Sequence, residues 1–440
     1  MTTFIAIVGG GPKGTYGVER LAAQLAADPP AEPVEIHIFN RTPHVGAGDI
    51  YDPGQPDYLL INYAIGNIDM WIDEAPPAVV PHPRPLTAWL REVQGLGVAD
   101  SDFASRATVG RYLAAGFDAI VEHLPPGVTA RCRVGEVVDL WQEGEAYRLA
   151  LRRAGATAPL PHRYRHVLLA TGHPHNPPDP TYRAFAARHF DTHFVPFIYP
   201  VEPALTSLPG GERVAVKGLG LTFIDAVLAL TEGRGGHFTQ GEAGLEYHPS
   251  GREPSAICPF SRSGLPMLPR GPHDGSAPFP LRFFTEEMLP LAGRPYDFEA
   301  DLWPLLRQEL TLAYYRVMLR NHGLPLSEVS SYEALESQID AFHRTHDAPC
   351  FDPSRFLDPL AGEPSRPPEA QHRFVLHYLR DGIAAARAGE ACDPRAAVTA
   401  VWRLALPLFR RLFEFGGLTA ASHERFMERY VGPLSRVTFG

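Results

Sequence analysis

The chain opens with a short apolar run, FIAIV, then three glycines in the spacing Gly9-x-Gly11-x-x-Gly14, and then a segment of helical character. This order predicts a strand, a tight turn and a helix. The first glycine permits the turn, the second admits a pyrophosphate to the backbone, and the third lets helix and strand pack closely. The helix N-terminus, where Pro12 stands, offers unpaired N–H groups to phosphates. The pattern favours a bound dinucleotide over a ligand-free strand–helix turn.

A second apolar stretch, Val34 to Phe39, predicts the next strand of the same unit. An acidic residue usually ends this strand, because a carboxylate accepts both ribose hydroxyls of a nucleotide. Asn40 stands there instead, and its amide can still bond a ribose. A second glycine pair, Gly46 and Gly48, follows in a loop. This loop either brings backbone close to a flat or charged ligand, or it is a flexible turn.

Two segments, 131–140 and 147–152, predict strands of a small antiparallel insertion. The run HVLLATG at 166–172 then predicts a buried parallel strand. In flavoproteins with two dinucleotide sites, such a strand returns to the first sheet and its Ala-Thr-Gly turn passes the flavin. Thr171 and Gly172 are therefore candidate cofactor contacts.

A second glycine turn, Gly218-x-Gly220, lies between the apolar run beginning at Val214 and an apolar helix predicted to reach residue 230. Phe223 replaces the third glycine. After a glycine-rich insertion, a strand is predicted at 256–260, and it ends in Ser261 and Arg262. A hydroxyl and a guanidinium at this place suit the 2′-phosphate of NADP. The alternative for Arg262 is a surface salt bridge.

From about residue 278 the pattern becomes helical. Segments 301–322, 371–388 and 397–415 have apolar residues at helical spacing, and their aromatic and leucine side chains are typical of a core. Gly323 is the expected C-cap of the first helix, and Pro407 is expected to kink the last.

Composition excludes several classes of partner. The 440 residues are 45% hydrophobic and 20% charged, with a formal net charge of −10, which argues against nucleic acid or an anionic membrane as main partner.

The four cysteines are far apart, so neither a disulfide nor a metal site is expected. His173 and His175 lack the further ligands that a metal needs. With no leader and no apolar segment long enough for a membrane span, the chain is expected to be soluble and cytoplasmic.

The sequence thus predicts an α/β fold with two dinucleotide-binding Rossmann-like units, for FAD and NADP, and an α-helical C-terminal domain. The expected boundaries are 1–205 for the FAD-binding domain with its antiparallel insertion, 206–277 for the NAD(P)H-binding segment, and 278–440 for the helical domain. A homo-oligomer is one open alternative for the assembly.

Several motifs together resemble one enzyme family. They are GGGPKG, GAGDIY, LLIN, the Phe103-x-x-Arg106-x-x-x-Gly110-x-Tyr112-Leu113 segment, the ATG turn, KGLGLTFIDAVLALTEGRGG, and YHPSGREP followed by SRSGLP. Their order is similar to that of the flavin-dependent monooxygenases grouped around a urate hydroxylase type and an L-aspartate N-hydroxylating, nitrosuccinate-forming type. The resemblance spans residues 4 to about 270. It implies FAD, NAD(P)H and O₂.

The resemblance also implies roles for individual residues. The first glycine turn holds the FAD pyrophosphate, Asn40 the adenosine ribose, and the Gly46/Gly48 loop passes the flavin. Asn62 is the candidate catalytic group, either bonding the flavin N5 or peroxide or serving as a loop hydrogen bond. Arg106 either anchors a phosphate or caps its helix. Longer family members continue where this chain ends at Gly440, so the flavin pocket is expected to be open, completed by another subunit, or non-functional.

The implied activity is FAD- and NADPH-dependent hydroxylation of a small nucleophilic substrate, including N-hydroxylation of an amino acid or amine, through a C4a-hydroperoxyflavin. The cofactor supplies this chemistry, so no catalytic triad or carboxylate pair is required. Two alternatives remain open on the residues: a flavin reductase or oxidase without oxygen transfer, and a non-catalytic protein that keeps the FAD/NAD(P) fold.

Overall fold

The computed structural model describes most of the chain, namely residues 2–172, 180–188, 194–199, 201–205, 207–241, 244–271, 279–292, 295–324, 326, 329–364 and 366–438. The chain divides into two compact units. One comprises Met1–Val214 and Asp225–Ile257, and the other comprises Ala215–Ile224 and Cys258–Gly440.

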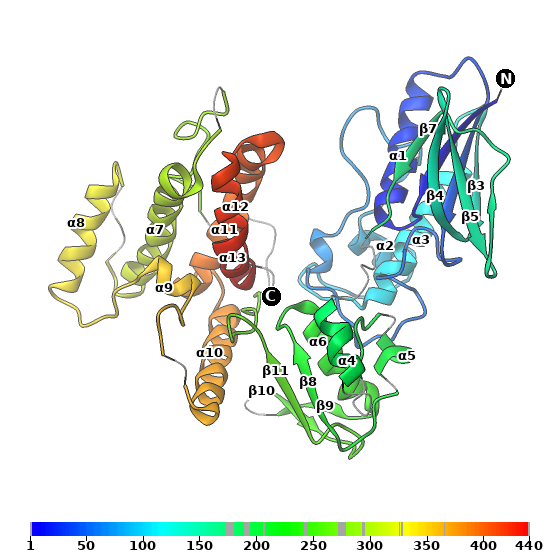
Figure 1. Cartoon of the computed structure of the whole chain (residues 1–440). Helices are drawn as coiled ribbons and strands as arrows, with labels where there is room; N and C mark the ends of the chain where they lie inside the picture. Colours follow the sequence, from blue (N-terminus) through cyan, green and yellow to red (C-terminus); the bar gives the residue numbers. More distant parts are fainter. Residues whose placement is uncertain are drawn as a thin grey trace. The chain divides into compact units, whose positions relative to one another are not determined.

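Strands and helices are both present up to residue 260, and the described elements that follow are helical (Figure 1). The strands are β1 (Thr3–Val8), β2 (Val34–Asn40), β3 (Val128–Val134), β4 (Glu136–Glu143), β5 (Ala146–Arg153), β6 (Ala156–Pro159), β7 (His166–Leu169), β8 (Arg213–Lys217), β9 (His237–Gly241), β10 (Gly244–His248) and β11 (Ala256–Phe260). The α-helices are α1 (Pro12–Ala27), α2 (Leu86–Glu92), α3 (Arg106–Glu122), α4 (Pro180–Arg188), α5 (Val201–Leu205), α6 (Leu221–Leu230), α7 (Trp303–Asn321), α8 (Tyr332–His343), α9 (Pro353–Leu357), α10 (Pro368–Ala388), α11 (Pro394–Phe413), α12 (Ala420–Arg429) and α13 (Val431–Thr438). Short turns of helix are η1 (Ile65–Asn67), η2 (Glu232–Arg234), η4 (Glu414–Gly416) and the π-turn η3 (Phe298–Leu302).

The first unit is built on a four-stranded parallel sheet in the order β3-β2-β1-β7. The registers pair Ile7 with Ile38 and with Leu168, so β1 lies at the centre. The strand predicted at 34–39 is confirmed, and so are the strand at 166–169 and its return to β1. The prediction that this later strand is buried was wrong, because β7 lies at the edge of the sheet and its Leu168 and Leu169 side chains are exposed. Because all four strands are parallel, their carboxyl ends meet at one edge of the sheet, where ligands of such folds bind.

Alternating side chains of β1 belong to two different clusters of buried residues. Ile7 packs with Val18 of α1 on the helical side. Ala6 and Val8 pack instead with residues that include Tyr164, beside the antiparallel sheet β4-β5-β6. The centre of the parallel sheet is therefore covered on both faces, which explains why β1 is apolar from Phe4 to Val8.

The prediction of one antiparallel insertion from residue 131 was wrong for its first residues. β3 runs parallel to β2 in the main sheet, and the antiparallel sheet begins only with β4. Gly135 separates the two strands, and its N–H donates to the Asn40 carbonyl oxygen at 2.8 Å. A two-residue alternation of side chains predicts an extended segment but not the strand with which it pairs. The sequence therefore did not show that residues 131–140 belong to two different sheets.

The second glycine turn lies between β8 and α6, and the predicted helix to residue 230 and the strand at 256–260 are confirmed. The glycine-rich insertion forms the antiparallel hairpin β9–β10. Strands β8 and β11 pair in one two-stranded sheet. Bonds link Ser255 to Glu212 at their starts and Gly218 to Phe260 at their ends, so the two strands run in the same direction.

The second unit is mainly helical, and α7 and α11 provide much of its core. Leu306 and Leu310 of α7 and Ala397 and Val401 of α11 are buried, each pair at the four-residue spacing of one helix face. All three predicted helices are confirmed. The prediction of core side chains was wrong for α10, where Ala385 is the one buried residue among those described and Leu376 is exposed. Gly323 follows α7 with φ +73°, as expected of a helix C-terminus, and α11 continues through Pro407.

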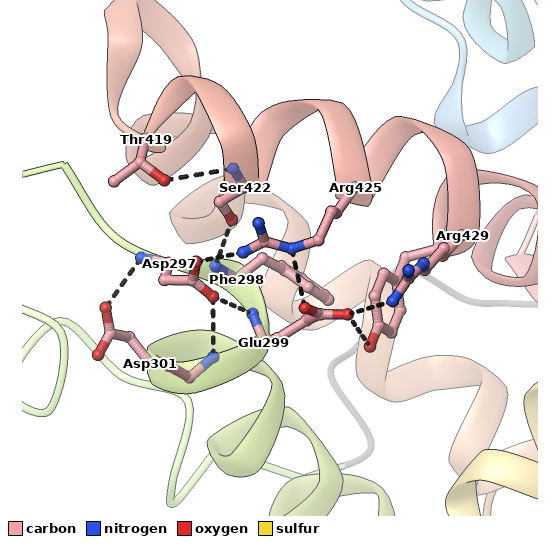
Figure 2. Close-up of polar contacts among 10 residues, drawn as sticks. Asp297, Phe298, Glu299, Asp301, Thr419, Ser422, Arg425 and Arg429 are labelled. Atoms are coloured by element: carbon pink, nitrogen blue, oxygen red, sulfur yellow. Dashed lines mark hydrogen bonds and ion pairs between the residues drawn. The ribbon is translucent and has the colours of Figure 1, made fainter.

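Helix α12 is attached to η3 by a compact polar network (Figure 2). The Phe298 N–H donates to Ser422 Oγ at 2.7 Å, and both residues are buried. Around this bond, Arg425 pairs with Asp297 and with Glu299. Since those ion pairs are about one-third exposed, the buried hydrogen bond is the more important polar contact for stability.

Replacing Ser422 by Ala removes the acceptor of a buried N–H. We expect Ser422→Ala to lower the free energy of unfolding by about 1–3 kcal/mol, measured by urea denaturation. Ser337→Ala, which removes an exposed helix hydroxyl, is the matched control and should change it by less than about 0.5 kcal/mol. Equal effects of the two substitutions would contradict this account.

A histidine lies buried between the two sheets of the first unit. His37 Nδ1 is 2.8 Å from the Tyr164 hydroxyl oxygen, and its Nε2 is 2.8 Å from Glu35 Oε1. Burial lowers the pKa of His37 below its usual value of 6.5, although Glu35 opposes this, and burial likewise lowers the pKa of His162. The folded state therefore favours the neutral imidazoles.

Because the unfolded chain binds these protons more readily, their contribution to stability is complete above pH 6.5 and is lost as the pH falls below that value. Between pH 6.5 and 5, the free energy of unfolding should therefore fall as the pH falls. We expect His37→Gln to make this dependence less steep, by at most ~1.4 kcal/mol per pH unit, measured by urea denaturation at several pH values. His82→Gln, at an exposed position, should leave the slope unchanged. A slope unaltered by His37→Gln would exclude His37 as its source.

Candidate functional site

The first glycine turn is fixed by close backbone contacts. Gly9 has φ +108°, and a Cβ there would overlap the carbonyl oxygen of Ala170. A Cβ on Gly14 would overlap the carbonyl oxygen of Gly9. Glycine at both positions lets α1 begin directly against the end of β1, so its N-terminus faces the carboxyl edge of the sheet.

This helix end suits an anionic group. Gly11 is the N-cap residue and has no side chain to cap the helix, Pro12 occupies the first turn, and no acidic residue lies there. Lys13 adds a cation to the same turn. The hydroxyl of Thr15 is buried and has no hydrogen-bond partner within the part of the chain that the structure describes. Unpaired N–H groups, a positive helix end and an unused buried hydroxyl together fit a bound diphosphate.

The second glycine pair closes on this turn. Gly46 donates its N–H to the Gly10 carbonyl oxygen at 2.7 Å, and a Cβ on Gly48 would lie 2.9 Å from the Cα of Gly11. Both loop glycines have positive φ, +95° and +66°. The loop therefore packs directly on the glycine turn, with backbone against backbone at Gly48 and Gly11.

Asn40 holds the turn from the end of β2. Its Oδ1 accepts from the Gly10 N–H at 3.2 Å, and its Nδ2 donates to the Thr42 carbonyl oxygen at 2.9 Å. The residue is buried. An aspartate could accept the first bond but could not donate the second, which is a physical reason for the amide. A contact between Asn40 and a ribose stays a prediction.

The end of β7 lies beside the first glycine turn, at the same edge of the sheet. The Ala170 N–H bonds to the Val8 carbonyl oxygen at 2.8 Å, which places Thr171 beside Gly9. The structure thus brings nine of the predicted cofactor residues to one edge of the sheet, namely Gly9, Gly11, Pro12, Gly14, Asn40, Gly46, Gly48, Thr171 and Gly172.

Arg106 lies elsewhere, at the start of α3. The side chain that caps this helix belongs to Ser105, which accepts from the Thr108 N–H. The buried Arg106 guanidinium instead lies 2.7 Å from Asp225 and donates to the Tyr199 hydroxyl at 3.2 Å. Burial raises the pKa of Asp225, while Tyr199 and Arg106 act in the opposite direction. A phosphate contact of Arg106 stays a prediction.

Sequence reasoning missed the two partners of Arg106. The only indication was a carboxylate, Asp225, within the otherwise apolar segment LTFIDAVLAL, where an unpaired charge would be costly. Tyr199 gave none, because it stands in an irregular segment far from both other residues along the chain.

Asn62, the candidate catalytic residue, lies half-buried in the loop before η1. This loop is held by the preceding residue, because the Ile61 N–H donates to the Ala104 carbonyl oxygen at 3.1 Å. Tyr112 is fully buried, and its hydroxyl donates to the Arg84 carbonyl oxygen and accepts from the Met70 N–H. That arrangement gives Tyr112 a packing role.

The predicted NADP residues lie at the carboxyl ends of β8 and β11. Gly218 has φ +109°, and no described heavy atom lies within 4 Å of a Cβ placed on it or on Gly220. Ser261 Oγ accepts from the Gly264 N–H at 3.0 Å, while Arg262 is exposed. This turn therefore has open space in front of its backbone.

Over the described ranges, no group of three or more histidine, cysteine, aspartate or glutamate side chains could hold a metal ion. His173 and His175 lie outside those ranges. None of the described helices has both the length and the apolar character needed to span a membrane.

Comparison with known proteins agrees with this geometry. A family model described as FAD-NAD(P)-binding matches residues 6–174. A nitrosuccinic acid synthase from Aspergillus oryzae is 30% identical over 454 residues, covering 98% of this chain and 68% of its own. An L-aspartate N-monooxygenase (nitrosuccinate-forming) from Streptomyces davaonensis is 31% identical over 479 residues, covering 98% and 72%. The chain belongs to the flavin-dependent monooxygenase family that contains these two enzymes.

As a member of this monooxygenase family, the protein is an oxidoreductase that uses FAD and NAD(P). Its mixed α/β fold class, with a helical C-terminal region, is confirmed. The urate hydroxylase type of the resemblance stays a prediction. Among solved structures, an ornithine hydroxylase from Pseudomonas aeruginosa is 16% identical and covers 78% of this chain and 70% of its own, with a TM-score of 0.37. That overall similarity is too low to transfer any detail.

The position of Asn40 generates a test. We expect Asn40→Leu to weaken FAD binding by about tenfold or more, because the buried Gly10 N–H would lose its acceptor at a cost of about 1–3 kcal/mol. Asn40→Asp keeps that acceptor and serves as the control, with a smaller loss. Flavin fluorescence titration of the cofactor-free protein measures both. Equal losses would show that the Gly10 bond is not what Asn40 contributes.

Proposed function

We propose that this protein is an FAD- and NADPH-dependent N-monooxygenase that hydroxylates the amino nitrogen of a small acidic amino acid, with L-aspartate as first candidate. The observation that carries the proposal is the uncapped start of α1, enclosed by the Gly46/Gly48 loop and bordered by the unused Thr15 hydroxyl. The substrate class comes from the names of the two relatives, which cover nearly the whole chain.

The FAD diphosphate is assigned to the backbone N–H groups at the start of α1, within the turn from Gly9 to Gly14. Lys13 contributes positive charge there, and Thr15 can donate its hydroxyl proton. The Gly46/Gly48 loop and the Thr171–Gly172 turn are assigned to the walls through which the flavin passes. A backbone lining suits this use because it allows close approach of a flat ring system.

NADPH is assigned to the second glycine turn, with Gly218 and Gly220 at the diphosphate. Ser261 and Arg262 follow β11, where the sequence departs from the acidic residue that selects NAD. A guanidinium can form paired hydrogen bonds with a phosphate, which a nucleotide lacking the 2′-phosphate does not offer. Arg262 is therefore the proposed source of preference for NADPH.

FAD, once reduced by NADPH, supplies the activation of O₂. The protein must hold the substrate amine in its neutral form, because an ammonium has no lone pair with which to attack oxygen. Asn62 is the proposed polar neighbour of the flavin, since its amide can both donate and accept hydrogen bonds without changing charge. Exclusion of water from this site would limit wasteful release of peroxide.

The proposed function includes the predicted division into an FAD-binding domain at 1–205, an NAD(P)H-binding segment at 206–277 and a helical domain at 278–440. Assembly into a homo-oligomer and location in the cytoplasm remain predictions.

Identification of the cofactor and product tests the proposal. Denatured protein should release FAD, and the native protein should consume NADPH and O₂ with L-aspartate and yield a product heavier by oxygen, detected by mass spectrometry. Recovery of all reducing equivalents as H₂O₂ with every amine tried would indicate a reductase or oxidase. Absence of bound flavin after incubation with FAD would indicate a binding protein instead.

The nucleotide assignment has its own test. We expect Arg262→Glu to reduce the ratio of kcat/KM for NADPH to that for NADH by about tenfold or more, since charge-assisted hydrogen bonds contribute about 1.5–3 kcal/mol. Arg252→Glu introduces the same charge change at an exposed position just before β11 and should preserve the ratio. An unchanged ratio in Arg262→Glu would refute the role of Arg262.

A further inference from the structure

A buried polar triad lies in the first unit, apart from the glycine turns. The Arg106 and Asp225 side chains are 11% and 3% exposed, and Arg106 Nη1 lies 2.7 Å from Asp225 Oδ2. The Tyr199 hydroxyl donates to the same Asp225 oxygen and accepts from Arg106 at 3.2 Å. Each charged group therefore has its partner within the protein.

Arg106 also holds the loop that carries Asn62. Its backbone N–H donates to the Leu59 carbonyl oxygen at 2.7 Å, and its Nε donates to the Leu60 carbonyl oxygen at 3.3 Å. Two hydrogen bonds from one residue thus fix two consecutive carbonyl groups, two and three positions before Asn62. The guanidinium can make the Leu60 bond while it pairs with Asp225, because it has five donors in a fixed plane.

Apolar contacts join the same two segments. Leu59 is almost completely buried in a cluster that includes Ala226 and Leu230 of α6. Asp225 stands on α6 as well, so the polar and apolar contacts connect the Leu59–Asn62 loop to the same helix. This helix begins at Leu221, directly after the second glycine turn.

We infer that Arg106, Tyr199 and Asp225 are positioning residues that tie helix α6, which begins at the proposed NADPH turn, to the loop carrying Asn62. Asp225 stands four residues after Leu221, about 6 Å along the helix at 1.5 Å per residue. The triad thus joins the Asn62 loop to the helix that follows the proposed NADPH turn. The inference rests on the proposed function for the roles of Asn62 and Gly220.

Two tyrosine substitutions form a matched pair for testing it. Tyr199→Phe removes only the hydroxyl that bridges Arg106 and Asp225. Tyr164→Phe removes a hydroxyl bonded to His37 between the sheets of the same unit. Asp225→Asn, a stronger change, removes the charge of the pair with little change in shape. Each variant is prepared as full-length protein, and its folding is checked by thermal unfolding.

Hydrogen–deuterium exchange of the cofactor-free protein gives a measure independent of catalysis. We expect Tyr199→Phe to accelerate exchange about tenfold in peptides covering 57–62 and 221–230, because the buried Arg106–Asp225 pair that connects them loses the hydroxyl bonded to both of its members. Tyr164→Phe should leave these peptides unchanged and accelerate exchange in the 136–153 region instead. Wild-type exchange at 57–62 and 221–230 in Tyr199→Phe would overturn the inference, even if Asp225→Asn fails to fold.

Anaerobic reduction of the bound flavin gives the second measure. We expect Asp225→Asn to bind FAD but to reduce the bound flavin about tenfold more slowly at saturating NADPH. The KM for NADPH should change by a smaller factor than this rate. Arg106→Lys should retain more of the rate than Arg106→Met, because it keeps the charge opposite Asp225. Wild-type reduction rates in Asp225→Asn and Tyr199→Phe would reject the positioning role. A wild-type protein that binds no FAD would instead reject the proposed function on which it rests.

Discussion

The arrangement of the nucleotide-facing edge depends on two places where backbone passes backbone without room for a side chain. Gly9 lies against the carbonyl group of Ala170, and Gly14 lies against that of Gly9. These contacts set the distance between β1, β7 and the start of α1. The unpaired N–H groups of the helix, the Gly46/Gly48 loop and the end of β7 are brought together because this approach is so close. Any side chain at either glycine would separate the elements that form the edge.

The polar side chains of Asn40, at the glycine turn, and of Arg106, at the start of α3, are both engaged with the protein itself. Asn40 supports the glycine turn through one bond that an aspartate could make and one that it could not. Arg106 is neutralised by Asp225 and also bonds the backbone of the Leu60 loop. Buried polar groups require such partners, because an unpaired one costs more than its hydrogen bond contributes. We therefore propose that nucleotide binding depends chiefly on backbone N–H groups and on the hydroxyl of Thr15.

Much of the fold could be predicted because its determinants are local. The glycine spacing, the apolar runs and the helical periodicity located β1, α1, β2, β7, α6 and the long helices of the second unit. Pairing could not be predicted in the same way. The segment around Gly135 looked like one insertion, yet β3 and β4 belong to different sheets. The burial of Glu309 within α7 is a second feature that could not be predicted in this way. Its carboxylate accepts from the N–H groups of Phe283 and Phe284, which lie far from it along the chain, and burial raises its pKa.

The sequence by itself determined where the chain turns, which strands and helices flank each glycine turn, and which family the motifs resemble. These features depend on residues close together along the chain, where steric limits and periodicity apply directly. The tertiary structure decided which distant groups meet: Gly10 with Asn40, Gly11 with Gly48, and Arg106 with Asp225. Such pairings depend on how strands and helices pack in three dimensions. A pattern read along one segment contains no record of its partner.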